Sequence, residues 1–295
     1  MVARLVEAGH DVTAVGRTAD KRRDLERLGA HPIDDVAEAG SQADIVVLCV
    51  FTDEQVRQVC LGSALLPAMP SGSTLVVHTT TSPKTIEAIA ARANEVDVVD
   101  APVSGGPHDI SAGKLTLFVG GADDAVARVR PVLGCYGDPV LQVGPRGAGQ
   151  TVKLVNNALF AGHIGLLAES IRLGERLGVP ESTLLDALPH GSATSRVLNI
   201  VAARGSVASF LEVAGEFVGK DVAVVRGIAE ELDDDLGALD RVIKVIDPVA
   251  TKAGKVCDGG VLVFPVRCGT ATVSVTVRQS AVTVPARNPP ARSIT

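Results

Sequence analysis

The fold of this chain is indicated most directly by residues 96–106, which read Val-Asp-Val-Val-Asp-Ala-Pro-Val-Ser-Gly-Gly. The apolar run at 96–99 is typical of a buried strand, and small residues follow it in a turn. Glycines leave the backbone amides of such a turn accessible, and accessible amides bind anions. We therefore predict a strand that ends in a loop, in which Ser104, Gly105 and Gly106 can hold a carboxylate.

Short apolar runs alternate with helical segments around that strand. The predicted strands lie at residues 12–15, 45–50, 74–77, 96–99, 114–119 and 140–143. The predicted helices between them lie at residues 19–28, 53–60, 83–93 and 123–133. Strands that are apolar on both faces and separated by helices indicate a parallel sheet with crossover connections. The predicted fold class is therefore α/β, a Rossmann-like doubly wound sheet, followed by an all-α domain.

From residue 150 onward the strand signals stop. Helices are predicted at residues 150–177, 181–188, 195–203, 215–232 and 236–253. We predict three parts: an α/β domain over 1–149, an all-helical domain over 150–258, and an atypical tail over 259–295. The tail has no acidic residue and contains several prolines, which favours disorder. We interpret it as a frameshifted or read-through extension, with a basic interaction arm as the alternative.

Composition excludes several classes of protein. The chain has 295 residues, of which 46% are hydrophobic and 21% charged, as in an ordinary globular enzyme. A net charge of -6 and an aromatic content of 2% argue against a nucleic-acid surface. No apolar run approaches the roughly 20 residues of a membrane helix. The five cysteines lack the spacing of metal ligands or redox motifs, so we expect no metal and a cytoplasmic location.

A second motif opens the long helix predicted after the sheet. Residues 147–157 read Gly-Ala-Gly-Gln-Thr-Val-Lys-Leu-Val-Asn-Asn. Lys153 and Asn157 are four residues apart and therefore share one helix face. A cation and an amide directed to one spot, beside an anion-binding loop, indicate acid–base chemistry on a small hydroxy acid.

Together these motifs resemble the β-hydroxyacid dehydrogenase family, which includes 3-hydroxyisobutyrate dehydrogenase and tartronate semialdehyde reductase. The family's substrate-loop pattern, Asp-Ala-Pro-Val-Ser-Gly-Gly, stands at residues 100–106 without substitution. Its catalytic pattern, Gly-x-Gly-x-x-x-Lys-x-x-x-Asn, matches residues 147–157, and its later Lys-Asp pair falls on residues 220–221. The resemblance extends from residue 1 to about residue 258.

The resemblance implies hydride transfer between NAD(P) and a small 3-hydroxy acid or its semialdehyde. Lys153 would donate the proton in aldehyde reduction and accept it in alcohol oxidation, and Asn157 would hold the substrate oxygen. The carboxylate would be bound by Ser104 and the amides of Gly105 and Gly106. Family precedent also implies a homodimer or homotetramer formed through the helical domain.

The cofactor residues implied by the resemblance are Arg17, Thr18, Val50, Phe51, Thr80 and Lys220. Lys220 would close over the cofactor from the helical domain. No acidic residue follows the strand at 12–15, where an NAD enzyme places one against the ribose hydroxyl. Arg17 stands there instead and can pair with a 2′-phosphate, so we predict NADP over NAD.

Two rival functions and several departures from the family remain open at this point. The rivals are an imine reductase of the same fold and a non-enzymatic nucleotide-binding protein. Asp109 and Ile110 replace the Gly-Ala usual in the substrate loop, which affects substrate preference more than chemistry. The first strand and the Gly-x-Gly-x-x-Gly turn are also missing from residues 1–10. We therefore expect either an upstream start or a domain that lacks a central strand and binds cofactor weakly.

Overall fold

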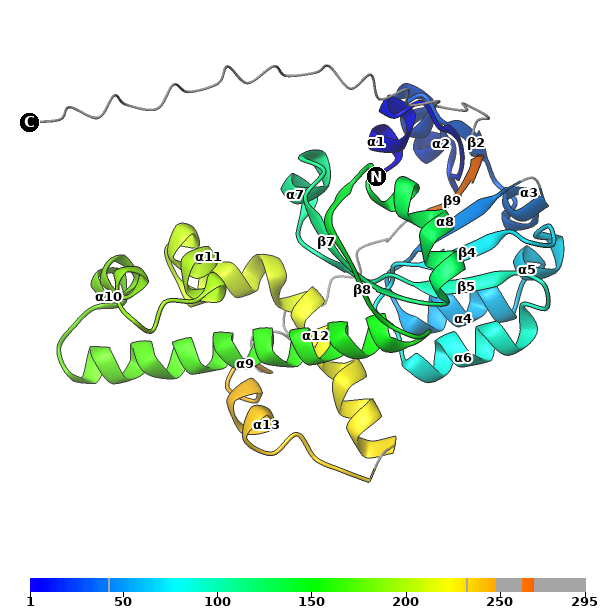
Figure 1. Cartoon of the computed structure of the whole chain (residues 1–295). Helices are drawn as coiled ribbons and strands as arrows, with labels where there is room; N and C mark the ends of the chain where they lie inside the picture. The colour runs from blue at the N-terminus through cyan, green and yellow to red at the C-terminus, as the bar shows by residue number, and fades with distance from the viewer. Residues whose placement is uncertain (42, 232, 248–261, 268–295) are drawn as a thin grey trace, which may run out of the picture.

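The chain forms an α/β part and a helical part, which a single long helix joins (Figure 1). The computed structural model describes residues 1–41, 43–231, 233–247 and 262–267. The joining helix is α9 (Ala148–Arg176), which starts under the sheet and continues through the helical part as its longest element. This arrangement is the predicted class, a Rossmann-like sheet followed by an all-α domain.

A nine-stranded mixed sheet forms the first part. Its order is β2-β1-β9-β3-β4-β5-β7-β6, and β8 pairs with β7 on a separate branch. The pairs β1–β2, β3–β4, β4–β5 and β7–β8 are parallel. The strand bounds are β1 Asp11–Val15, β2 His31–Ile33, β3 Ile45–Cys49, β4 Thr74–Val77, β5 Asp97–Asp100, β6 Val103–Ser104, β7 Leu115–Gly120, β8 Gly137–Gly144 and β9 Leu262–Arg267.

The strand β9 occupies the centre of this sheet, between β1 and β3. It runs antiparallel to both, with Leu262 opposite Cys49 and Val266 opposite both Val12 and Ile45. The predicted gap at this place is therefore filled by a strand from the tail, and the prediction of disorder is wrong for residues 262–267. Residues 268–295, the rest of the predicted tail, lie outside the described residues.

Both faces of the sheet are covered because alternate side chains of each strand point to opposite cores. In β3, Ile45 and Val47 belong to one apolar core, while Val46 and Leu48 belong to the other. The first core is closed by the helices α1 (Val2–Glu7), α2 (Ala19–Arg27) and α8 (Asp123–Leu133). The second is closed by α3 (Val36–Ser41), α4 (Asp53–Leu61), α5 (Leu65–Ala68) and α6 (Pro83–Arg92).

The helical part is built around α9 and the helices that follow it. These are α10 (Glu181–Ala187), a 3₁₀ turn (Leu188–His190), α11 (Arg196–Arg204), α12 (Val207–Glu231) and α13 (Ala238–Ile243). They share a third apolar core, in which Ile164 of α9 and Phe210 of α12 are buried. A smaller cluster of Leu154, Ala158 and Val225 holds α12 against the start of α9.

Two helices differ from their predicted bounds. Helix α12 begins at Val207 rather than at 215, because Phe210 and Leu211 bury against the helical core. Helix α13 covers only the first part of the helix predicted over 236–253, and residues 248–253 lie outside the described part of the chain. No single described helix is long and apolar enough to cross a membrane; α11 and α12 meet that test only as a pair bent by 115°.

Candidate functional site

The residues predicted to bind a cofactor lie at one edge of the sheet. Arg17 and Thr18 follow β1, Val50 and Phe51 follow β3, and Thr80 follows β4. These three strands run parallel to one another, so their carboxyl ends meet at the same edge. In open α/β sheets ligands bind outside the carboxyl ends of the strands.

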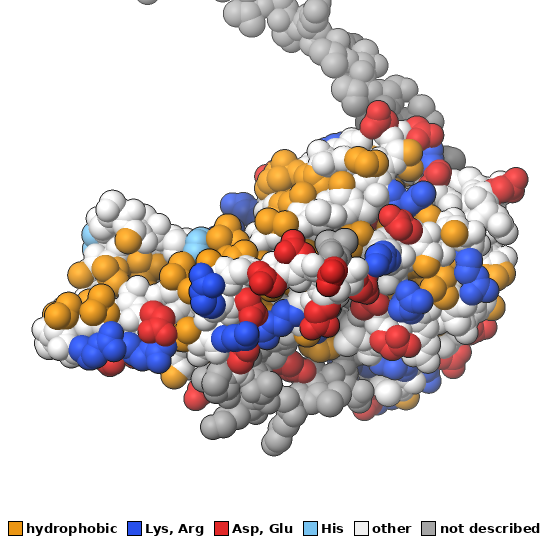
Figure 2. Space-filling view, turned by 90° about the horizontal axis from the view of Figure 1, so that it is seen from below, with side chains coloured by type: hydrophobic (Ala, Val, Ile, Leu, Met, Phe, Trp, Pro, Cys, Tyr) orange, Lys and Arg blue, Asp and Glu red, His pale blue; other side chains and the backbone are white. Residues whose placement is uncertain are grey.

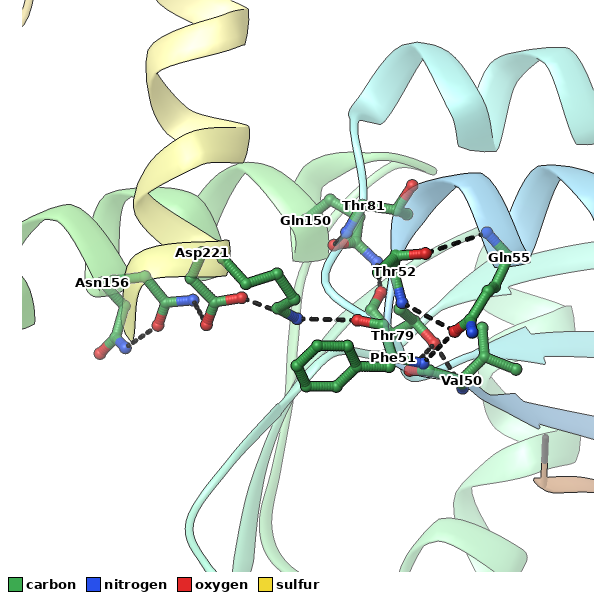
Figure 3. A network of polar contacts seen from close by, with 11 residues as sticks. Val50, Phe51, Thr52, Gln55, Thr79, Thr81, Gln150, Asn156 and Asp221 are labelled. Carbon is green, nitrogen blue, oxygen red and sulfur yellow. Dashed lines mark hydrogen bonds and ion pairs between the residues drawn. The ribbon is translucent and has the colours of Figure 1, made fainter. Parts of the chain in front are cut away.

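Side chains and backbone hold this edge rigidly. Thr79 Oγ1 accepts from the Val50 amide at 2.8 Å and donates to the Val50 carbonyl at 2.9 Å. The Phe51 amide donates to Gln55 Oε1 at 2.8 Å, and the same oxygen accepts from the Thr52 amide at 3.1 Å. The turn after β3 is therefore fixed before any ligand binds (Figure 3).

Asp100 anchors the start of α9 to the end of β5. Its side chain is fully buried, with Oδ1 accepting from the Gly147 amide at 2.6 Å and Oδ2 from the Gln150 amide at 2.8 Å. A carboxylate at a helix N-terminus is favoured by the helix dipole and satisfies amides that have no partner within the helix. Burial nevertheless raises the pKa of Asp100, and these hydrogen bonds offset only part of that effect.

Gln150 ties the same turn of α9 to the end of β4. Its Nε2 donates to the Thr79 carbonyl at 2.9 Å, and its Oε1 accepts from the Thr81 amide at 3.0 Å. Thr81 is itself buried, and its hydroxyl is one of two side-chain oxygens in the described residues that are buried without a hydrogen bond.

Lys153 and Asn157 follow on the next turns of α9, on one face as predicted. Lys153 is half-buried and forms no hydrogen bond or ion pair with any described residue. Asn157 is buried at 8% exposure; its Oδ1 accepts from Asn156 Nδ2 at 3.1 Å, and its Nδ2 donates to Asp221 Oδ2 at 2.6 Å. Asn157 is therefore held in one orientation by a carboxylate from α12.

Lys220 crosses from the helical part to the sheet edge. Its Nζ donates to the Phe51 carbonyl at 3.1 Å and lies 5.1 Å from the centre of the Phe51 ring. It also lies 2.9 Å from Asp221 Oδ1, so the polar contacts run unbroken from Asn156 through Asp221 to Phe51 (Figure 3). The Phe217 ring packs edge-on against the Phe51 ring, with centroids 5.4 Å apart.

The groups around Lys153 change the pKa of its amine. Burial lowers the pKa of the Lys153 amine, because the charged form loses hydration. The Asp221 carboxylate opposes this effect and raises that pKa, whereas the nearby Lys220 charge lowers it further. A lowered pKa makes the neutral amine easier to reach, so this lysine is suited to both giving and taking a proton.

The substrate loop departs from the predicted arrangement at one amide. The Gly106 N–H donates to Asp109 Oδ2 at 2.8 Å, so an internal carboxylate already occupies this donor. Gly105 has a φ of 138°, which favours glycine, and a β-carbon there would lie 2.9 Å from the same Asp109 oxygen. Asp109 thus caps the short helix α7 (Pro107–Ser111) through the Gly106 amide, and the predicted contact between this amide and a substrate carboxylate stays a prediction.

The structure brings some of the predicted residues together and leaves others separate. Asn157, Lys220 and Phe51 share one polar network, with Lys153 beside it. Within the described ranges, no hydrogen bond or ion pair joins Ser104, Gly105 or Gly106 to that network. Among the same residues, no group of three or more His, Cys, Asp or Glu side chains is placed to hold a metal.

Comparison with known proteins identifies the class. Residues 1–144 match the NAD binding domain of 6-phosphogluconate dehydrogenase, and residues 147–256 match the domain described as NAD-binding of NADP-dependent 3-hydroxyisobutyrate dehydrogenase. The chain is thus an oxidoreductase with NAD(P)-binding domains. It belongs to the β-hydroxyacid dehydrogenase family, whose members transfer hydride between NAD(P) and 3-hydroxy acids.

Individual relatives agree with this assignment. An uncharacterized oxidoreductase of Shewanella frigidimarina is 36% identical over 199 residues, which cover 66% of this chain and 68% of the relative. The 2-hydroxy-3-oxopropionate reductase of Escherichia coli is 32% identical over 205 residues, covering 68% and 69%. The solved Mycobacterium tuberculosis 3-hydroxyisobutyrate dehydrogenase with L-serine has the same fold, with a TM-score of 0.76 at 24% identity over 86% of this chain and 89% of that one.

Several residues of the site are not predicted as site residues from the sequence. Asp221 appeared there only as part of a motif, and neither Gln150 nor Thr79 was singled out. The motif identifies Asp100 only as the first residue of the loop pattern, although its side chain caps α9. The signal that could have found Asp100 was its place at the end of a buried strand, where an unpaired carboxylate is costly and must meet donors.

Proposed function

We propose that the chain reduces small semialdehydes to 3-hydroxy acids with NAD(P)H, and catalyses the reverse oxidation, with Lys153 as the proton donor and acceptor. The observation that carries this proposal is the half-buried Lys153 amine, whose pKa is lowered and which has no partner in the described part of the chain. A lysine held for structure would be paired or solvated. This one is placed beside Asn157 and Lys220, the other two residues expected at the reaction centre.

The sheet edge fits a nicotinamide dinucleotide, which supplies the hydride when bound. The fixed turn after β3 and the bridging Lys220 would offer contacts for its sugar and ring. Val50, Phe51 and Thr80 would line that surface. Lys220 would hold the helical part against it, since it already donates to the Phe51 carbonyl.

The proton step follows from the state of Lys153. In reduction its ammonium gives a proton to the carbonyl oxygen as negative charge develops there, and in oxidation its neutral amine takes the hydroxyl proton. Asn157 would hold the same oxygen in line, since Nδ2 carries a second N–H besides the one given to Asp221. Ser104 and the Gly105 amide would bind the substrate carboxylate, and Gly106 would join them only after Asp109 moves away.

We further propose that NADP is preferred to NAD. Arg17 follows β1, and helix α2 opens nearby with Thr18 as its N-cap and with Asp20 in its first turn. Lys21 and Arg22 stand in the first turns of that helix, where Arg22 donates to the Gly16 carbonyl at 2.8 Å and lies 3.9 Å from Asp34, so a 2′-phosphate would meet Arg17 and Lys21 first. The ratio of kcat/KM for NADPH and NADH tests this preference, and equal values would refute it.

We also propose that the helical part, residues 150–258, pairs with a second copy of the chain. Val155, Leu159, Leu166 and Leu173 lie along α9 at spacings of four and seven residues and are 49–65% exposed. Phe217 and Val213 add to this surface from α12. Figure 2 shows hydrophobic side chains gathered over the elongated helical part. Light scattering should report a dimer or tetramer, and Leu166→Glu should reduce it to a monomer.

A panel assay tests the central proposal. Purified protein is mixed with NADPH or NADH and each of several small semialdehydes, and cofactor oxidation is followed at 340 nm. We expect turnover with at least one semialdehyde that carries a carboxylate. Folded protein that oxidises neither cofactor with any of them would overturn the proposal.

A further inference from the structure

Asp221 connects the residues of the proposed reaction centre, although it sits on a helix that contributes no part of the substrate loop. It lies within α12, and its side chain is only 18% exposed. Oδ2 accepts from Asn157 Nδ2 at 2.6 Å, and Oδ1 lies 2.9 Å from Lys220 Nζ. The Asp221 carboxylate thus contacts both Asn157 of α9 and Lys220 of α12, the residue that reaches the sheet edge.

The two oxygens of this carboxylate are used differently. Oδ2 forms a short hydrogen bond, whereas Oδ1 is buried and accepts no aligned hydrogen bond, although it pairs with the Lys220 charge. A buried carboxylate that is short of hydrogen bonds interacts strongly with nearby positive charges, because little water screens it. The charged groups that act on the Lys153 amine are Asp221 and Lys220, both on α12.

From this geometry we propose that Asp221 is a positioning residue for the reaction. It orients the Asn157 amide, anchors Lys220 over Phe51, and supplies the negative charge that keeps Lys153 able to carry its proton. The proposal rests on the function proposed above, because it takes Lys153 as the proton donor and acceptor. It adds that proton transfer, substrate orientation and the contact between the two parts of the chain depend on one carboxylate.

Two substitutions separate this role from a purely structural one. In Asp221→Asn an amide oxygen can still accept from Asn157, so the geometry is kept while the charge is lost. In Lys220→Met the positive charge is lost and Asp221 keeps its own. Because Asp221 raises the pKa of Lys153 and Lys220 lowers it, the two variants must shift Lys153 in opposite directions.

The shift can be measured without turnover. Acetic anhydride acylates only the neutral amine, so the extent of Lys153 labelling, read by mass spectrometry over a pH series, follows its titration. Labelling of the exposed Lys114 serves as the internal reference for reagent activity in every sample. Circular dichroism checks that each variant is folded. We expect the Lys153 labelling curve to move to lower pH in Asp221→Asn and to higher pH in Lys220→Met.

The pH profile and the kcat of the reduction provide a second, independent measurement. Reduction needs the ammonium, so the alkaline limb of its pH profile should move to lower pH in Asp221→Asn. Asp221→Ala, which also frees Asn157, should lower kcat by on the order of 10²-fold, the effect of displacing a reacting group by about 1 Å.

Failure of the Asp221 proposal can be distinguished from failure of the proposed function, because the labelling experiment does not require turnover. A labelling curve that stays in place in Asp221→Asn, or that moves the same way in both variants, would overturn the role of Asp221 whatever the activity. If Asp221→Asn does not fold, the test uses Lys220→Met. A Lys153 labelling curve that stays in place or moves to lower pH in that variant would also contradict the proposal. Absence of turnover with correctly opposed shifts would instead count against the proposed reaction alone.

Discussion

Replacing Asp100 with alanine should destabilise the protein far more than the removal of so small a side chain suggests. The change leaves the amides of Gly147 and Gln150 buried without acceptors. Each unsatisfied amide costs about 1–3 kcal/mol, and the lost carboxylate at the start of α9 adds roughly 0.3–1 kcal/mol. Relief from burying a carboxyl group offsets part of this sum, so we expect a net loss of about 3 kcal/mol.

The assay is urea unfolding at pH 7, followed by far-ultraviolet circular dichroism. A loss of about 3 kcal/mol is a large fraction of the roughly 5–15 kcal/mol that stabilises a typical domain. It corresponds to a fall in Tm of roughly 6–12 °C for a chain of this size. Asp100→Asn keeps one acceptor and should lose about half as much.

Asp97 provides a matched control on the same strand. Its carboxylate pairs with Arg128 at the surface, where both side chains are more than 40% exposed. Such pairs contribute roughly 0–1 kcal/mol, so Asp97→Ala should change stability little. The reasoning would be refuted if Asp100→Ala and Asp97→Ala lost the same free energy of unfolding.

Three further predictions concern other parts of the molecule. Burial lowers the pKa of His78 from 6.5 to about 4, so its folded state binds fewer protons than the unfolded chain in that window. Stability should therefore fall by about 3 kcal/mol as pH drops from 6.5 to 4, a loss that His78→Gln should remove from the unfolding curves. A chain that ends at residue 261 lacks β9 and should be several kcal/mol less stable than one that ends at residue 267, at about 1 kcal/mol per backbone hydrogen bond. Asp109→Ala frees the Gly106 amide and should lower KM for a substrate that carries a carboxylate, but not for a neutral aldehyde.

Each of these has an outcome that would contradict it. An equal pH dependence in the wild type and in His78→Gln would deny that the buried imidazole, held by the Ala101 carbonyl and Tyr136, resists protonation. Equal stability of the two shortened chains would show that β9 contributes nothing to the sheet. An unchanged KM for carboxylates in Asp109→Ala would mean that Gly106 does not bind substrate.

The sequence predicts the parallel core of the sheet well, because those strands are buried on both faces. The apolar runs at 45–50 and 74–77 match β3 and β4 within one residue, and the long helix after residue 147 is a single element. The short strand β2 was missed because it has only three residues and includes Pro32. Helix periodicity likewise placed Lys153 and Asn157 on one face.

The remaining features depend on contacts between distant residues. The place of β9 is decided by the open edges of β1 and β3, more than two hundred residues earlier, so no local pattern in the tail identifies it. Asp221 meets Asn157 only because α12 crosses α9, and the crossing is decided by apolar packing around Val225. Asp109 was recognised as unusual, but its bond to Gly106 depends on the path of the loop.

The most direct test of the proposed function is the kcat/KM for semialdehyde reduction by Lys153→Met, compared with Lys114→Met as a control on the surface. General acid catalysis contributes about 10²–10⁴-fold. We therefore predict a loss of that size in Lys153→Met, with Lys114→Met close to the wild type. A Lys153→Met enzyme whose kcat/KM stays within about tenfold of the wild type would contradict the role of Lys153 as the proton donor.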